Sequence, residues 1–466
     1  MSTAAETSLS GQDLAFLAWE SAKRPMHIAA TAEFEGTECE LRSVEALREK
    51  LLPSVLAEPM LTRRLLRRRW RTPRWSAPEA IDLAAHVRSL SELAKPGESL
   101  EDTRARVLAA PLDAERPLWE IWLEPTDPTA PLRLHFKVHH VVADGIGALS
   151  LLERLFGSAD SVPAPGRRPR ARAPASATGD TNAPPARAHA KRAEREERRT
   201  RSGGLLRFVR EHLTRGVRTP LSGTVGRGRT YHSLSLDAGA FQALRAQQDV
   251  SANDTLLALV AGALERWLAA EPGASVPESV RAFCPVSLRA PGERNGGNRI
   301  APWFVPLPIG GVSRAERALA IQAATRRLRR QRAERGGDRM AQLVRRLGTW
   351  LARLGMAVAA WRNAFDLVVT NLPGPRSTVT LSKGRLSKLA AHPPLFPGQR
   401  VCIAVVQTDD RWTLALHTGF QDARRADRLA AALRAELHDA LSPFEANGTS
   451  EARSSDPASR PRTGAA

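Results

Sequence analysis

The chain has 466 residues, enough for two domains with sizeable cores, and its 42% hydrophobic content is typical of a globular protein. Its formal net charge of +20 indicates an acidic partner, such as nucleic acid, an anionic lipid surface or a phosphorylated cofactor. Aromatic residues make up only 5% of the chain and no nucleic-acid-binding motif is present, so we expect no nucleic-acid partner.

The cysteines and the apolar runs indicate the compartment. Cys39, Cys284 and Cys402 are far apart and show neither a disulfide framework nor zinc-site spacing, which suits a reducing compartment. We find no signal peptide, and no apolar run approaches the roughly 20 residues that span a bilayer. We therefore expect a cytoplasmic protein, or one bound peripherally to the inner membrane or to lipid inclusions.

Alternating apolar and polar residues predict two strands early in the chain, over residues 28–34 and 132–138. The second strand runs into the cluster His139-His140-Val141-Val142-Ala143-Asp144-Gly145. Asp144-Gly145 is a turn signal, and apolar residues then recur at helical spacing from Ile146 to Phe156. The cluster should therefore lie on a strand-to-helix loop, where a rigid scaffold often presents chemistry.

Strand parity gives the two histidines of this cluster different directions. If the strand continues, His140 shares its apolar face and points inward, while His139 points the other way. A neutral imidazole is a suitable general base near pH 7. Gly145 would allow a backbone conformation that is closed to other residues. A chance cluster of structural histidines is the alternative, and the rarity of this spacing argues against it.

The composition changes sharply over residues 157–203, where proline, alanine and arginine replace the large apolar residues. This stretch carries 11 basic and 5 acidic residues, and we expect it to be a disordered basic linker. It separates an N-terminal domain over 1–156 from a C-terminal domain over 204–445. A similar polar stretch over 446–466 should form a disordered tail.

The second half continues the mixture of strands and helices. Directly after the linker, apolar residues at four-residue spacing alternate with arginines over 205–217. This pattern fits either a membrane-interface helix or a helix packed on the domain. Residues 255–269 predict a buried helix, and 401–407 with 412–417 predict a hairpin. The mixture favours an α/β fold with mixed sheets.

Ten motifs occur in an order that identifies a family resemblance. They are Asp13-Leu14-Ala15-Phe16-Leu17, Pro25-Met26-His27, Pro111-Leu112-Asp113, Arg116-Pro117-Leu118-Trp119-Glu120, the double-histidine cluster, Asn253-Asp254, Pro285-Val286-Ser287-Leu288-Arg289, Gly297-Asn298-Arg299, Phe304-Val305-Pro306-Leu307-Pro308 and Thr370-Asn371-Leu372-Pro373-Gly374-Pro375. Over about residues 8 to 440, with a gap at the linker, the chain resembles the bacterial wax ester synthase/diacylglycerol acyltransferase family. Ser222 and Ala301 depart from the asparagine and serine usual in the family, at places that bear on acceptor preference.

The resemblance implies two chloramphenicol acetyltransferase-like domains with mixed sheets flanked by helices, joined by the disordered linker. It implies transfer of a fatty acyl group from acyl-CoA to diacylglycerol or a long-chain alcohol. His140 is then the general base. His139 either braces the loop or acts directly, and Asp144 orients the loop by pairing with Arg289. Acyl-CoA is the co-substrate, and no metal or other cofactor is implied.

Two further residues have competing interpretations. Asn253 is either a donor to the oxyanion of the reaction or the N-cap of the following helix. Trp119 either lines the substrate channel or lies in the core. No Gly-x-Ser-x-Gly elbow is present and Cys284 has no recognisable partner in sequence, so we expect no acyl-enzyme.

Two other functions fit part of this pattern. A condensation-type acyltransferase would take its acyl group from a carrier, but the chain has no recognisable carrier or adenylation segment. A non-catalytic lipid-binding protein would be expected to lack His140 or Asp144, and both are present.

Overall fold

The computed structural model describes residues 7–36, 39–67, 72–157, 216–226, 228–287, 298, 300–330, 345–346, 348–375, 377–408 and 411–454. The predicted linker, apart from Gly157, lies outside these residues. So do Arg289 and all but the last two residues of the predicted helix over 205–217.

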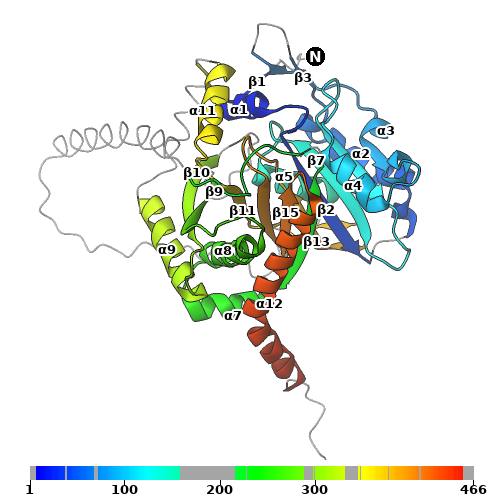
Figure 1. Cartoon of the computed structure of the whole chain (residues 1–466). Coiled ribbons are helices and arrows are strands. Elements are labelled where there is room, and N and C mark those ends of the chain that lie inside the picture. The colour runs from blue at the N-terminus through cyan, green and yellow to red at the C-terminus, as the bar shows by residue number, and fades with distance from the viewer. Residues whose placement is uncertain are drawn as a thin grey trace, which may run out of the picture.

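Within the described residues, the N-terminal half is built on a six-stranded sheet with strand order β12-β13-β2-β7-β6-β5 (Figure 1). Its strands are β2 (His27–Glu35), β5 (Val87–Ser89), β6 (Trp119–Glu124), β7 (Leu132–His139), β12 (Thr380–Leu381) and β13 (Gly384–His392). Its helices are α1 (Gly11–Trp19), α2 (Val44–Leu56), α3 (Leu83–His86), α4 (Leu100–Ala109) and α5 (Gly145–Phe156). Short elements complete this half: β1 (Thr7–Ser8), β3 (Leu65–Leu66), β4 (Arg74–Trp75), η1 (Cys39–Arg42), η2 (Pro59–Leu61) and η3 (Ser91–Leu93).

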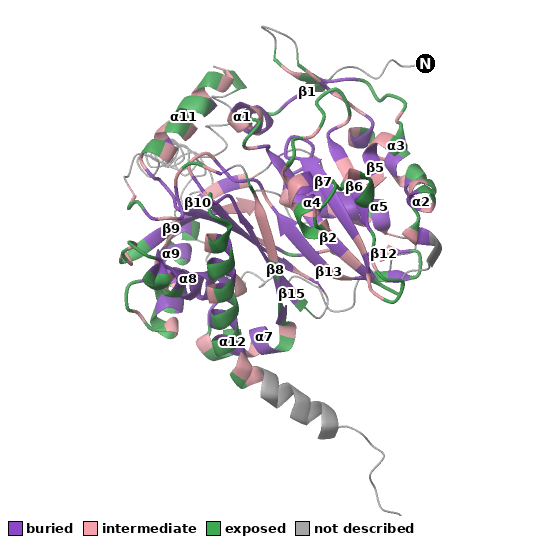
Figure 2. Cartoon of the chain, turned by 45° about the vertical axis from the view of Figure 1, so that its right-hand side comes forward, coloured by how far each residue is buried: buried purple, intermediate pink, exposed green. Residues whose placement is uncertain are grey.

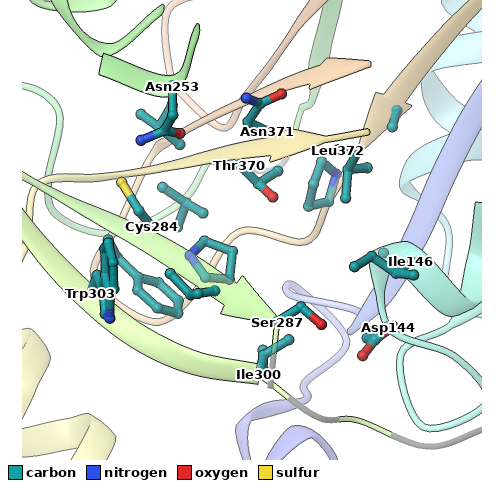
Figure 3. A pocket seen from close by; sticks show the side chains of 18 of the residues that line it. Asp144, Ile146, Asn253, Cys284, Ser287, Ile300, Trp303, Thr370, Asn371 and Leu372 are labelled. Carbon is teal, nitrogen blue, oxygen red and sulfur yellow. The ribbon is translucent and has the colours of Figure 1, made fainter. Parts of the chain in front are cut away.

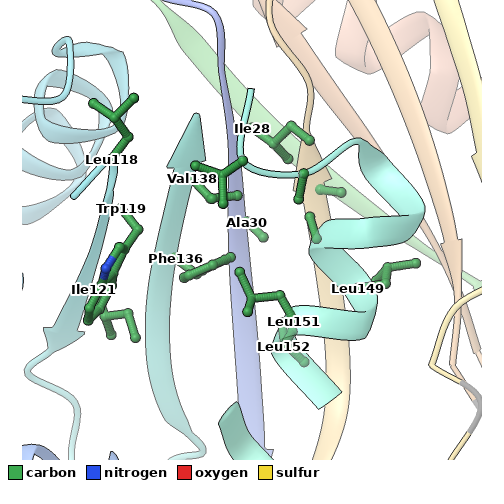
Figure 4. Close-up of a cluster of buried hydrophobic side chains, with 14 of the residues drawn as sticks. Ile28, Ala30, Leu118, Trp119, Ile121, Phe136, Val138, Leu149, Leu151 and Leu152 are labelled. Atoms are coloured by element: carbon green, nitrogen blue, oxygen red, sulfur yellow. The ribbon is translucent and has the colours of Figure 1, made fainter. Parts of the chain in front are cut away.

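The alternation that predicts these strands also assigns their two faces. Ile28 and Ala30 of β2 pack in the main core with Leu151 and Leu152 of α5, as Figure 4 shows. Ala29 lies on the opposite face and packs in a separate cluster with Leu108 of α4. The sheet is thus covered by α2 and α5 on one face and by α4 on the other, because successive side chains of a strand point to opposite faces.

The C-terminal half carries a second six-stranded sheet among the described residues, with order β10-β9-β11-β14-β15-β8. Its strands are β8 (Thr230–Asp237), β9 (Ser279–Ser287), β10 (Ile300–Pro308), β11 (Leu367–Leu372), β14 (Val401–Gln407) and β15 (Arg411–Thr418). Its helices are α7 (Ala238–Gln248), α8 (Ala252–Ala270), α9 (Arg314–Arg330), α11 (Thr349–Trp361) and α12 (Ala423–Ser454). The sheet is mixed, because β11 runs parallel to β9 and β14 while the other neighbouring strands are antiparallel. The predicted α/β class with mixed sheets flanked by helices is confirmed.

A hairpin from the C-terminal half completes the N-terminal sheet. Residues 380–392 belong by position to the C-terminal domain, but they form β12 and β13 of the N-terminal sheet. β13 pairs antiparallel with β2 from Arg385 opposite Glu35 to His392 opposite Ala29. An uncovered β2 edge would leave a row of backbone donors and acceptors without partners, and β13 supplies them.

The last element is helix α12, which extends from Ala423 to Ser454. Residues 455–466 lie outside the described part of the chain, so the disordered tail stays a prediction. Among the described helices, none is both long enough and apolar enough to cross a bilayer.

Candidate active site

A cavity of about 720 Å³ opens between the two sheets, with lining residues from both halves of the chain (Figure 3). Its walls are mostly apolar, from Ile28, Gly145, Ile146, Phe283, Cys284, Pro285, Val286, Ile300, Trp303, Val368, Val369, Leu372, Ala391, Pro393, Pro394 and Phe396. The polar lining residues are His140, Asp144, Ser251, Asn253, Asp254, Ser287, Thr325, Arg329, Thr370 and Asn371. Such a wall suits a ligand with a long apolar part and a small reactive polar group.

His140 lines this cavity directly after the end of β7, which confirms that it points inward. Its ring stacks on Phe16 of α1 with a centroid separation of 3.8 Å and an interplanar angle of 11°. Its Nδ1 lies 2.7 Å from Oδ1 of Asn298. The imidazole is therefore held by one face and by one edge, as a positioned base requires.

The hydrogen bonds of Asn298 determine which nitrogen of His140 carries the proton. The amide Nδ2 donates to Oδ1 of Asp13 at 2.6 Å and to the backbone carbonyl of His140 at 2.7 Å. Since both of those partners are acceptors, the amide oxygen must be the atom that faces the ring. His140 therefore donates from Nδ1, and Nε2 is left with the free lone pair.

The electrostatic surroundings keep this imidazole neutral. Burial lowers the pKa of His140 to about 4, although the charge of Asp144 and the hydrogen bond to Asn298 act in the opposite direction. The ring is therefore unprotonated near pH 7, the state in which Nε2 accepts a proton.

His139 faces away from the cavity and is fixed by two hydrogen bonds. Its Nδ1 accepts from the backbone N–H of Val141 at 3.1 Å, so its Nε2 donates to Oε1 of Glu20 at 2.8 Å. Burial alone would raise the pKa of Glu20, but the bonds from His139 and Arg67 outweigh it and lower that pKa to about 2. These contacts favour the bracing interpretation of His139 over a direct role.

Asp144 is buried and shapes the loop after the histidines. It is the N-cap of α5, and its Oδ1 accepts from the N–H of Gly147 at 2.8 Å. Asp144 thus positions the loop and also acts on His140 through its charge. Its expected pairing with Arg289 concerns a residue outside the described part of the chain.

The reason given for Gly145 from the sequence is wrong. Gly145 begins α5 and does not occupy the left-handed region of the backbone map. Space restricts this position instead, because a Cβ there would lie only 2.9 Å from Cδ2 of Leu372, which lines the cavity. A side chain at 145 would push Leu372 aside.

Of the two residues expected to bind substrate, Asn253 lines the cavity and Trp119 does not. Asn253 lines the cavity, and it is not the N-cap of α8, because Ser251 caps that helix by accepting from the N–H of Asp254. Figure 3 shows Asn253 well away from Asp144, near Asn371 and Cys284. Trp119 does not line the cavity. It is fully buried in the core and donates from Nε1 to the carbonyl of Leu61 at 2.8 Å, which corrects the substrate-channel expectation.

Three residues that hold His140 received no role from the sequence. Asp13 and Phe16 lie in the first of the ten motifs, and Asn298 lies in the Gly297-Asn298-Arg299 motif. Their presence in those motifs was the available signal, but only the fold brings α1 and Asn298 to the ring of His140. In the described ranges, no group of three or more His, Cys, Asp or Glu side chains is arranged to hold a metal ion.

The fold is similar to that of two solved structures. A wax ester synthase/diacylglycerol acyltransferase from Marinobacter aquaeolei is 21% identical, and the match covers 93% of this chain and 99% of that one with a TM-score of 0.62. The first condensation domain of the calcium-dependent antibiotic synthetase is 20% identical, with coverage of 95% and 97% and a TM-score of 0.61. These two likenesses establish the shared fold.

Sequence comparison shows the family to which the chain belongs. Residues 9–256 match the wax ester synthase/diacylglycerol acyltransferase catalytic domain, and residues 296–440 match the C-terminal domain of the same family. A probable diacylglycerol O-acyltransferase of Mycobacterium tuberculosis is 25% identical over 470 residues, covering 91% of this chain and 94% of the relative. A putative one from the same organism is 27% identical over 437 residues, covering 83% and 86%. The chain belongs to the wax ester synthase/diacylglycerol acyltransferase family and is an acyltransferase.

Proposed function

We propose that this enzyme transfers a fatty acyl group from acyl-CoA to the hydroxyl of diacylglycerol, of a long-chain alcohol, or of both. The observation that carries the proposal is the neutral His140, whose protonated nitrogen is bound by Asn298 and whose other nitrogen is free, at the wall of a largely apolar cavity. An alcohol is a poor nucleophile until a base removes its proton, and His140 Nε2 is such a base.

The proposed reaction needs one base and no covalent intermediate on the enzyme. Nε2 of His140 takes the hydroxyl proton as the alcohol oxygen attacks the thioester carbonyl. When the tetrahedral intermediate collapses, the C–S bond breaks and the same imidazolium gives its proton to the CoA thiolate. An ester and free CoA leave, so acyl-CoA acts as co-substrate and no metal or other cofactor takes part.

The cavity offers features that suit both substrates. Its apolar wall matches acyl and alkyl chains, while Arg329 of α9, an exposed side chain that also lines the cavity, offers a guanidinium to the phosphates of CoA. Asn253 is proposed to contact a polar group of a bound substrate. Figure 3 shows Asn253 in a different part of the cavity from Asp144. We therefore expect a substitution of Asn253 to raise KM more than it lowers kcat.

The test follows thiol release from palmitoyl-CoA with dioleoylglycerol, hexadecanol or no acceptor, and resolves the product lipids. We expect alcohol-dependent release of CoA together with triacylglycerol, wax ester or both. Release that no alcohol stimulates would contradict the proposal. An aminoacyl thioester acceptor tests the condensation-type alternative, which would yield an amide instead of an ester.

Direct transfer also predicts that the thiol in the cavity is dispensable. Burial, reinforced by the charge of Asp254, raises the pKa of Cys284 to about 12, so its nucleophilic thiolate form is scarce at pH 7. Figure 3 places Cys284 with Trp303, at the end of the cavity away from Asp144. We expect Cys284→Ser to keep kcat within about threefold of the wild-type value.

The measurement for Cys284→Ser is steady-state kinetics, combined with mass spectrometry of the protein after it is mixed with palmitoyl-CoA alone. Cys402→Ser is the matched control, since Cys402 is a buried cysteine that does not line the cavity. An acyl adduct that forms on the wild type and disappears in Cys284→Ser would refute direct transfer.

A further inference from the structure

Helix α11 lies at the edge of the molecule beside α1, with an inner face that is fixed and an outer face that is exposed (Figure 2). Ala352 and Ala359 are buried on the inner face. Two bonds join the helices: Trp19 Nε1 donates to the carbonyl of Ala352 at 2.9 Å, and Arg353 Nε donates to the carbonyl of Ala18 at 3.2 Å. The orientation of α11 is therefore set by its contacts with α1.

The outer face of α11 presents large apolar side chains to solvent. Trp350, Leu354 and Trp361 are 57%, 52% and 71% exposed. Their separations of four and seven residues place them on one stripe of the helix. Scattered single apolar residues on a surface need no explanation, but two tryptophans and a leucine aligned on one helix mark an interaction surface.

The stretch of sequence that carries this stripe has charges of one sign. Between residues 339 and 362 the sequence has five arginines and no acidic residue. Among them, Arg353 lies within α11, and the guanidinium of Arg362 lies over the ring of Trp361 at 5.3 Å from its centroid. An apolar stripe with exposed tryptophans and a basic surround matches a surface that is apolar below and anionic above.

We propose that α11 is the face by which this enzyme docks on an anionic phospholipid surface, with Trp350, Leu354 and Trp361 inserted among the lipids. The helix has 13 residues and is about 20 Å long, so it lies in the plane of the interface rather than crossing it. A second copy of the chain is the less suitable occupant, because its arginines would face those around the stripe and the chain already carries +20.

Docking through α11 would also place the catalytic residues near the lipid. α1, to which α11 is bonded, carries Phe16 and Asp13, and these two residues hold His140 directly and through Asn298. The membrane face is thus one helix away from the base. The inference is independent of the proposed acyl transfer, since docking is a property of the surface and needs no substrate.

The experiment measures co-sedimentation of the full chain with phosphatidylcholine vesicles that contain or lack phosphatidylglycerol, without any acyl-CoA. We expect the wild type to bind the anionic vesicles, and Leu354→Ser/Trp361→Ser to reduce their partition coefficient at least tenfold. Leu52→Ser/Leu56→Ser on α2 is the matched control, because those leucines are 40% and 57% exposed on another helix, and it should bind like the wild type.

Three measurements make the outcome decisive. A thermal melt verifies that both double variants are folded, and light scattering reports their mass. The proposal would be overturned if Leu354→Ser/Trp361→Ser bound the vesicles as strongly as the wild type does. It would also be overturned if the wild type were a dimer and this variant were a monomer that still bound the vesicles. Salt should weaken binding by the wild type, because the arginine contribution is electrostatic, and binding unaffected by both salt and phosphatidylglycerol would also overturn it.

Discussion

His140→Ala should lower kcat for acyl transfer by about 10² to 10⁴-fold, because general-base catalysis typically contributes that much. The measurement is alcohol-dependent thiol release from palmitoyl-CoA at pH 7. His139→Gln is the control variant: it changes the neighbouring histidine, which faces Glu20 instead of the cavity, and it should lose less than tenfold. Equal losses in the two variants would show that His140 has no special role in proton transfer.

The same assignment fixes the pH dependence of the wild type. The base must be neutral to act, and burial lowers the pKa of His140 to about 4. As pH falls, the fraction of neutral His140 decreases only near that value. We therefore expect kcat/KM to stay level from about pH 8 down to about pH 5 and to fall tenfold per pH unit below about pH 4. An acid limb centred near pH 6.5 would indicate an unburied histidine. Brief assays started by dilution into each buffer separate titration from acid unfolding.

Asn298→Ala should have the second largest effect, lowering kcat about 10- to 100-fold while His140 remains present. The substitution removes the acceptor that binds Nδ1–H of His140, so the ring is no longer held in the form that leaves Nε2 free. It also removes the donor to Asp13 and to the backbone carbonyl of His140, which costs about 1–3 kcal/mol of stability.

A spectroscopic measurement distinguishes positioning from a general loss of structure. Nitrogen NMR of histidine-labelled protein should show His140 protonated at Nδ1 in the wild type, with its signal identified by its absence in His140→Ala. The Asn298→Ala variant should show a mixture of the two ring forms and still melt cooperatively. Wild-type kcat in a folded Asn298→Ala variant would contradict the role assigned to this amide.

The sequence predicted secondary structure correctly where that structure depends on residues close together along the chain. Alternation predicted strands over 28–34 and 132–138, and the structure has β2 at His27–Glu35 and β7 at Leu132–His139. The uninterrupted apolar run at 255–269 became α8 at Ala252–Ala270. Strand parity alone predicted that His140 points inward. Each of these predictions depends on neighbours a few residues apart, whose spacing is visible in the sequence.

The sequence misled where one residue type has two physical uses. A glycine after a turn suggested a left-handed backbone at Gly145, but the tight approach of Leu372 restricts that position. For Trp119 the sequence left a channel wall and the core as alternatives, and its ring lies in the core. Packing distinguishes such pairs of uses, and composition does not.

By itself, then, the sequence determined the α/β elements, the family and the histidine that faces the cavity. Only the tertiary structure decided how that histidine is held. The bond from His140 to Asn298 joins residues 158 positions apart, and the bond from Asn298 to Asp13 joins residues 285 positions apart. The hairpin of β12 and β13, from the C-terminal half, likewise completes the N-terminal sheet. A hydrogen bond acts over about 3 Å whatever the separation along the chain, so contacts of this kind appear only when the two sheets pack together.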